Sequence, residues 1–207
     1  MTLTFLFIGI TVITSIYAWN NARIQYGWMM NPYEIRRRKQ YFRFVSSGFI
    51  HQDGVHLFFN MFSLYFFGQN VEAYYTYIFG VPGLLLFGAL YILGIVVSDI
   101  PSYLKHKNRP AYNSLGASGG VSAVIFASVL FDPVSNICLY AILCLPGFLL
   151  AILYLIYSYY QGKRGGDNIN HDAHFYGAVF GIIFTIVIYP LVVVNFIEHL
   201  KDYSPFS

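Results

Sequence analysis

The amino-acid sequence predicts an all-α membrane protein, with six transmembrane helices in one domain over residues 1–207. Three observations support this fold class: few charged residues, a high mean hydropathy of +0.56, and long windows without charge. Only 10% of the chain is charged and 57% is hydrophobic, whereas a soluble domain carries about 25% charged residues. A larger hydrophobic core cannot explain the low fraction of charged residues, because a soluble domain of this size still exposes a hydrated, charged surface. We therefore expect lipid to be its main solvent.

Six windows lack Asp, Glu, Lys and Arg, and each is 18 to 30 residues long. A helix that crosses a bilayer needs about 20 mostly apolar residues, so each window has room for one span. The windows do not show the alternation of polar and apolar residues expected for strands of a membrane barrel. The expected spans are residues 3–20, 54–71, 80–98, 116–132, 137–159 and 173–195.

The first window lacks the basic start and small-residue cleavage site of a signal peptide, so we interpret it as a span. The connector that follows, Asn20–Ile50, carries six Lys or Arg residues interleaved with Trp and Tyr. Aromatic rings beside basic side chains suit the bilayer interface. We expect this first loop to be a partly folded element on the membrane. We do not expect a nucleic-acid site, because nothing else in the chain would complete a soluble binding face.

The second span contains two strongly polar residues, His56 and Asn60, and His51 precedes it. Residues four apart stack on one face of a helix. Polar and ionisable side chains cost free energy inside a bilayer, so they are functional candidates by default. For these two residues alone, hydrogen bonding between helices is an equally good structural explanation.

The fourth span opens with small residues, and Ser118 lies among them. Gly116 and Gly120 have the G-x-x-x-G spacing that lets helices approach closely. Packing explains these glycines but does not require a serine between them. At the start of a helix, Ser118 would lie beside unpaired backbone N–H groups and a partial positive charge. That environment suits the stabilisation of an alkoxide or a tetrahedral oxyanion.

The fifth span contains both cysteines of the chain, Cys138 and Cys144. Two thiols six residues apart on one buried helix cannot link two segments, so we expect packing residues and no disulfide. The connector after this span, Gln161–Asp172, contains three glycines. Its flexibility makes it a candidate for a segment that controls access to the site.

The sixth span carries His174 one turn before Gly177, on the same face as Gly181. Two glycine-rich helices that pack closely would bring His174 near Ser118. A serine nucleophile needs an adjacent base, and a neutral histidine can act as one. Asp172 could orient the imidazole as a third member, but two residues away on a helix it faces elsewhere.

A metal site is the rival chemistry. Four histidines could act as ligands: His51, His56, His171 and His174. The sequence has no H-E-x-x-H motif, no pair of cysteine ligands and no carboxylate within a predicted span. We therefore expect neither a metal nor a cofactor.

Taken together, these motifs resemble the rhomboid family of intramembrane serine proteases, from about Phe42 to Gly181. The three motifs occur in order on the second, fourth and sixth spans. They are H-x4-H-x3-N (His51, His56, Asn60), G-x-S-G (Gly116, Ser118, Gly119) and A-H-x-x-G-x-x-x-G (Ala173, His174, Gly177, Gly181). Weaker similarities are Phe42-Arg43, where the family usually has Trp-Arg, and Gly68 with Glu72 at the end of the second span.

The resemblance implies a role for each motif. Ser118 would be the nucleophile and His174 the general base of a dyad without a carboxylate. His56, Asn60 and the backbone N–H of Ser118 would form the oxyanion hole. Four glycines would support the close packing of the helices: Gly116, Gly119, Gly177 and Gly181. The protein would then be a serine endopeptidase that cuts single-pass membrane proteins in or near their transmembrane segments.

One departure from the family pattern leaves alternatives open. Ser122 stands where the family often has an aromatic residue stacked on the catalytic histidine. A catalytically inactive rhomboid-like protein that binds membrane helices is the first alternative. A small six-span transporter is the second, although it would need a charged pathway or a visible repeat.

We expect a multi-pass protein of the bacterial inner membrane. Its first, third and fifth connectors, which are Asn20–Ile50, Ser98–Ser114 and Gln161–Asp172, would lie on one side. These connectors carry 11 of the 12 Lys and Arg residues. The positive-inside rule would place that side in the cytoplasm, whereas the resemblance implies the opposite side. For the sequence-based prediction we follow the resemblance.

Overall fold

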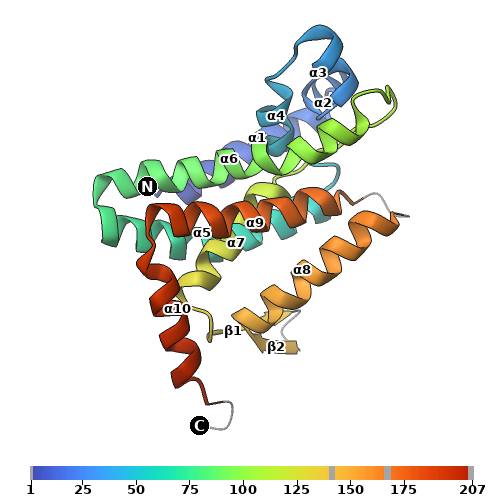
Figure 1. The fold of residues 1–207 in the computed structure, drawn as a ribbon. Coiled ribbons are helices and arrows are strands. Elements are labelled where there is room, and N and C mark those ends of the chain that lie inside the picture. Colours follow the sequence, from blue (N-terminus) through green and yellow to red (C-terminus); the bar gives the residue numbers. More distant parts are fainter. Residues whose placement is uncertain (1, 140–142, 166–168, 205–207) are drawn as a thin grey trace.

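The computed structural model describes residues 2–139, 143–165 and 169–204, and it is mostly helical (Figure 1). A two-stranded hairpin interrupts the helices between α7 and α8. The elements are α1 (Leu3–Trp19), α2 (Ala22–Trp28), α3 (Pro32–Arg38), α4 (Arg43–Ser46), a 3-10 turn (Ser47–Phe49), α5 (Gly54–Phe79), α6 (Val81–His106), α7 (Ser118–Phe131), β1 (Asn136–Leu139), β2 (Leu143–Pro146), α8 (Gly147–Arg164), α9 (His171–Ile188) and α10 (Leu191–Asp202).

The helical architecture agrees with the predicted fold class. By length and composition, α6 and α9 could each cross a membrane, and α1 and α7 are shorter apolar helices. This criterion marks two spans within the described residues, so the six-span bundle stays a prediction.

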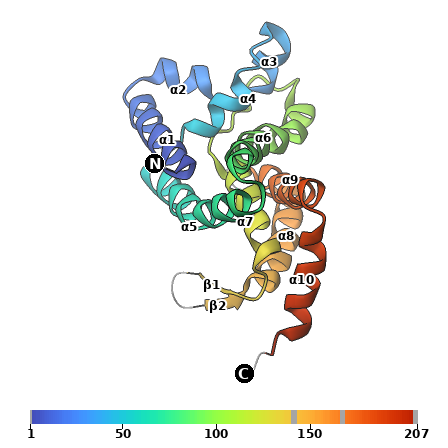
Figure 2. The same ribbon diagram turned by 90° about the vertical axis from the view of Figure 1, so that its left-hand side faces the viewer.

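Helix α7 lies at the centre of the molecule, between α5, α6 and α9 (Figures 1 and 2). Eleven of its fourteen residues are buried, and most of them have small or β-branched side chains. Larger side chains of α5 and α6, such as Tyr75, Phe87 and Tyr91, complete the core around it. A helix so enclosed can hold a functional group within the protein interior.

Helices α7 and α9 touch through their backbones. A Cβ atom built on Gly177 would lie 2.2 Å from the carbonyl oxygen of Gly119, and one built on Gly181 would lie 2.2 Å from that of Ala123. Both distances are shorter than any real Cβ contact, so only glycine fits at either position. The G-x-x-x-G pattern of α9 therefore faces α7 directly.

The N-terminus of α1 is held by a carboxylate of α5. Glu72 Oε1 accepts from the backbone N–H of Leu3 at 2.8 Å, and Oε2 accepts from the N–H and the hydroxyl of Thr4 at 2.9 and 2.6 Å. The first N–H groups of a helix lack partners within that helix, and a negative charge near them is favourable. Glu72 therefore fixes α1 against α5.

The first loop is folded, as expected, into α2, α3, α4 and the 3-10 turn. The buried side chain of Arg43 holds it together, donating from Nη1 to the carbonyl oxygens of Tyr26 at 2.9 Å and Met29 at 2.8 Å. Its Nε donates to Gln40 at 2.7 Å. Burial lowers the pKa of Arg43, yet these acceptors provide the partners that a buried guanidinium requires.

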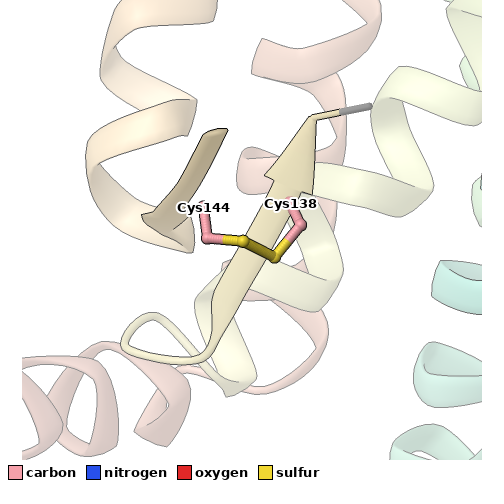
Figure 3. The surroundings of a disulfide bond; sticks show 2 residues. All are labelled: Cys138 and Cys144. Atoms are coloured by element: carbon pink, nitrogen blue, oxygen red, sulfur yellow. A yellow bond between two sulfur atoms is a disulfide. The ribbon is translucent and has the colours of Figure 1, made fainter. Parts of the chain in front are cut away.

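The structure corrects the prediction for the fifth span. Strands β1 and β2 pair antiparallel with Cys138 opposite Cys144, and the two cysteines form a disulfide (Figure 3). The expectation of two packing thiols on one helix is therefore wrong, and α8 begins only at Gly147. A short apolar run does not distinguish strand from helix, and Pro146 disfavours helical geometry in the residue before it.

Other helix ends also differ from the predicted spans. Helix α7 starts at Ser118, so Gly116 lies before it, and α9 ends at Ile188, two residues before Pro190. Helices α5 and α6 extend beyond their uncharged windows, so both contain a carboxylate that the span prediction had placed outside: Glu72 and Asp99. Residues 166–168 of the proposed access-controlling connector lie outside the described residues.

Candidate active site

The first turns of α5 and α9 lie on the same side of the molecule, and α7 begins between α6 and α9 (Figure 1). Ser118 is the first residue of α7 and is partly exposed. Gly116, two residues earlier, has a φ of +122°, and a Cβ there would lie 2.6 Å from His56 Cε1 and 2.8 Å from His56 Nε2. The sequence thus needs glycine at 116 for two reasons, backbone conformation and the space that the imidazole of α5 occupies.

Buried His51 holds the segment before Ser118. Its Nε2 accepts from the backbone N–H of Ala117 at 3.2 Å, so the hydrogen of the neutral ring is on Nδ1, which lies 3.1 Å from Ser15 Oγ. Burial, followed by the nearby His56, lowers the pKa of His51 to about 3. Both ring nitrogens thus have hydrogen-bond partners, and the neutral imidazole links α1 to the start of α7.

The first loop supports the same segment from the other side. Met30 and Ser114 exchange two backbone hydrogen bonds of 2.9 and 3.0 Å, and the N–H of Gly116 donates to the carbonyl of Ser47 at 2.9 Å. These contacts fix the chain that leads into α7. The sequence motifs gave no indication of them, because they join residues about 70 to 85 positions apart.

His56 and Asn60 lie on α5 next to the start of α7. His56 is partly exposed, and its ring packs against Gly116. Asn60 is buried one turn further along, where its Nδ2 donates to the carbonyl of His56 at 3.0 Å. One of its two amide hydrogens is therefore engaged within its own helix.

His174 is partly exposed on the first turn of α9 and lies among aromatic rings. The ring of Tyr154 is nearly parallel to it, with an interplanar angle of 22° and centroids 6.2 Å apart. The ring of His171 meets it edge-on at 5.8 Å. Sequence reasoning missed Tyr154, because α8 has four tyrosines within seven residues and no motif distinguishes one of them.

The start of α9 is fixed by a cap and an ion pair. Asn170 Oδ1 accepts from the N–H of Ala173 at 3.1 Å and from the hydroxyl of Ser102 at 3.1 Å. The carboxylate of Asp172 lies 3.2 Å from Lys105 Nζ on α6. The carboxylate of Asp172 therefore pairs with Lys105 of α6. This contact does not support a role for Asp172 as the third member of a catalytic triad.

A small cavity adjoins Ser118, with about 20 Å³ open to the centre of a water molecule. That space is enough for one water. Its polar lining comes from α6, the segment before α7 and the cap of α9, through Ser98, Asp99, Ser114 and Asn170. Within the described ranges, no group of three or more His, Cys, Asp or Glu side chains could hold a metal ion.

The geometry thus brings the predicted residues to one place. Ser118 directly precedes Gly119, and His174 lies one turn before Gly177, so the backbone contact between these glycines joins the first turns of α7 and α9. The hydroxyl of Ser118, the imidazole of His174 and a polar cavity adjoin that contact, and the imidazole of His56 lies beside Gly116. Such a set of groups can carry out acyl transfer to serine.

Comparison with known proteins gives two matches. The family model described as "Rhomboid domain" matches residues 38–191. The protein named "RHOMBOID-like protein 12, mitochondrial" from Arabidopsis thaliana is 28% identical over 155 residues, which cover 67% of this chain and 44% of that protein. This chain therefore spans less than half the length of the curated relative that it matches.

Proposed function

This chain belongs to the rhomboid family, and we propose that it is an active intramembrane serine endopeptidase with Ser118 as nucleophile and His174 as base. The observation that carries the proposal is the contact between Gly119 and Gly177 at the first turns of α7 and α9. Each glycine is close in sequence to one member of the dyad. A pair of helices that touch through backbone holds short side chains near one another with little freedom.

In the proposed reaction, His174 removes the proton from the hydroxyl of Ser118 as Oγ attacks the substrate carbonyl carbon. The backbone N–H of Ser118, the imidazole of His56 and the amide of Asn60 stabilise the oxyanion. His174 then protonates the leaving amine, which leaves an acyl-enzyme. Water, for which the cavity beside Ser118 has room, attacks the acyl group and regenerates the serine.

We propose that α1, α5, α6, α7, α8 and α9 form the six-span bundle in the membrane. Helix α7 has 14 residues, or about 21 Å at 1.5 Å per residue, and is shorter than the hydrocarbon layer of about 30 Å. If the C-terminal end of α7 lies near one membrane surface, its N-terminal end does not reach the opposite surface. Ser118 would then lie within the bilayer thickness, at the bottom of a polar opening that admits water.

The proposed substrates are single-pass membrane proteins. A peptide in a helix has a shielded, hydrogen-bonded carbonyl, so the segment to be cut must unwind before it reaches Ser118. Gly or Pro near the cleavage site lowers the cost of unwinding. The bacterial inner membrane stays a prediction, since the name of the Arabidopsis relative places that protein in mitochondria.

The competing proposal is an inactive rhomboid-like protein, and the feature in its favour was Ser122. The ring of Tyr154 lies parallel to that of His174, so the absence of an aromatic residue at 122 does not leave the histidine without a stacked ring. This observation supports the active enzyme.

The test is cleavage of a single-pass substrate in proteoliposomes, together with labelling by a fluorophosphonate probe. We expect the wild type to cut and to be labelled, and Ser118→Ala and His174→Ala to lose cleavage. Ser128→Ala is the matched control, because this buried serine lies on the same helix away from the site, and it should cut normally. Cleavage by Ser118→Ala would refute the dyad. A wild type that neither cuts nor reacts with the probe would support the inactive alternative.

A further inference from the structure

One tyrosine of α8 contacts both helices of the dyad. The hydroxyl of Tyr154 lies 3.0 Å from Ser122 Oγ on α7, and its ring lies parallel to that of His174 on α9 at a centroid distance of 6.2 Å. The ring also contacts Phe126 of α7, at 5.7 Å and 47°. A single side chain thus links α7, α8 and α9 beside the predicted base.

Ser122 lies one helical turn after Ser118, on the same side of α7. Because its side chain is small and ends in a hydroxyl, the Tyr154 ring can reach across α7 and be held at its tip. The ring beside His174 therefore comes from α8, while α7 contributes the hydrogen bond from Ser122 and the ring contact with Phe126. Ser122 and Tyr154 thus form one hydrogen-bonded pair, and Tyr154 stands in none of the sequence motifs.

The pair Ser122 and Tyr154 can control the orientation of the His174 imidazole. An imidazole turns about its χ2 angle over a broad range, but a base must direct one nitrogen at the serine hydroxyl. A ring stacked on one face limits this rotation, and offset aromatic pairs at this distance are favourable. The hydrogen bond to Ser122 in turn restricts the tyrosine ring.

We propose that Tyr154 is a positioning residue for His174 and that Ser122 holds it in place. The proposal rests on the function proposed above, and it concerns a residue that contacts the base, not the substrate. It also ties α8 to the dyad. Only two of the 18 residues of α8, Gly147 and Ser158, are buried, and Tyr154 is one of several aromatic residues through which this helix contacts α9.

The experiment measures kcat and KM for substrate cleavage in Tyr154→Leu, Tyr154→Phe and the double variant Ser122→Tyr/Tyr154→Leu. We expect Tyr154→Leu to lower kcat about 2- to 12-fold, the range that an aromatic pair supplies, with KM little changed. Tyr154→Phe keeps the ring and should stay within about threefold of the wild type. The double variant moves the tyrosine to α7 and should recover most of kcat.

Tyr160→Leu is the matched control, because this exposed tyrosine lies on the same helix, and it should cut like the wild type. If Tyr154→Leu cuts as fast as Tyr160→Leu, the proposal is wrong. It is also wrong if the double variant stays as slow as Tyr154→Leu, or if Tyr154→Phe is as slow.

Thermal unfolding in detergent separates positioning from general loss of structure. If the unfolding temperature of Tyr154→Leu is well below that of Tyr160→Leu, the loss of kcat could come from instability. Tyr154→Phe and Tyr154→Trp, which keep an aromatic ring, then distinguish positioning from loss of structure. Near-normal kcat in both supports positioning, and a loss in both as large as that of Tyr154→Leu refutes it. A wild type that does not cut refutes the proposed protease function first, whereas a cutting wild type with an equally fast Tyr154→Leu refutes positioning alone.

Discussion

Replacing Gly177 with alanine tests whether backbone contact between α7 and α9 sets the geometry of the dyad. The added Cβ would lie 2.2 Å from the carbonyl oxygen of Gly119 and 2.9 Å from its carbonyl carbon. Ordinary van der Waals contact begins at 3.4 Å, so the oxygen and the methyl group must separate by about 1.2 Å. Neither partner is a flexible side chain, so the helices themselves must move.

A displacement of this size is large for catalysis. Misplacing a reacting group by about 1 Å can reduce the rate by about 100-fold, so we expect kcat of Gly177→Ala to fall by roughly that factor. Inserting a methyl group into a packed contact also costs about 1–3 kcal/mol of stability. The variant should therefore unfold at a lower temperature while remaining folded at the assay temperature.

Two control variants separate the effect on the dyad from the effect on stability. In Gly181→Ala the new Cβ meets the carbonyl oxygen of Ala123 at the same 2.2 Å, but one turn further from Ser118 and His174. We expect a similar fall in unfolding temperature and a smaller fall in kcat. Gly9→Ala, whose Cβ would meet no atom within 4 Å, should behave like the wild type in both measurements.

The assay is substrate cleavage in proteoliposomes, with thermal unfolding of the same preparations in detergent. A Gly177→Ala protein that cuts within about threefold of the wild type would refute the reasoning. Equal losses of kcat in Gly177→Ala and Gly181→Ala would show that stability, and not the separation at the dyad, limits the rate.

Three further predictions concern residues outside the dyad. Burial keeps the pKa of His51 at about 3, below the value of about 6.5 in an unfolded chain. The unfolded state therefore binds a proton that the folded state excludes, and stability should fall by about 1.4 kcal/mol between pH 7.5 and pH 5.5. Thermal unfolding against pH should show this contribution, and His51→Gln should reduce the slope by that amount; an unchanged slope in that variant would contradict the assignment. Glu72→Gln removes the charge at the start of α1 and should cost about 1 kcal/mol in an unfolding experiment, whereas the exposed control Asn70→Ala should cost little. Cys138→Ser should lower stability by about 2 kcal/mol, the value expected for so short a loop, yet leave kcat within twofold, because the hairpin follows the end of α7 opposite to Ser118. A large loss of activity there would mean that the hairpin contributes to the site.

Much of the fold could be predicted from local sequence patterns. The position of α1, the start of α7 near Ser118 and the glycine face of α9 are encoded within a few residues, because helix packing through small residues has a fixed spacing. Helix ends were predicted less well. Uncharged windows end at the first charged residue, yet Glu72 and Asp99 lie inside helices, where hydrogen bonds to Thr4 and Ser47 satisfy them.

The parts of the site that depend on tertiary structure could not be predicted. Several tyrosines near the end of α8 are equivalent in sequence, and the tilt and rotation of that helix select Tyr154 for contact with His174. The role of His51 depends on Ala117, 66 residues away. The hairpin at Cys138 was missed because a short apolar run between two prolines fits either secondary structure.

The hairpin disulfide also bears on the direction in which the protein faces. Disulfides persist in oxidising compartments and are rare in the cytosol, and the hairpin lies at the opposite end of α7 from Ser118. The connectors at the Ser118 end carry 11 of the 12 basic residues, which favours the cytoplasmic side. Redox state and charge thus give the same polarity, the reverse of the one that the family resemblance implied. If the proposed endopeptidase has that polarity, cleavage on the Ser118 side frees the cytoplasmic part of its substrate.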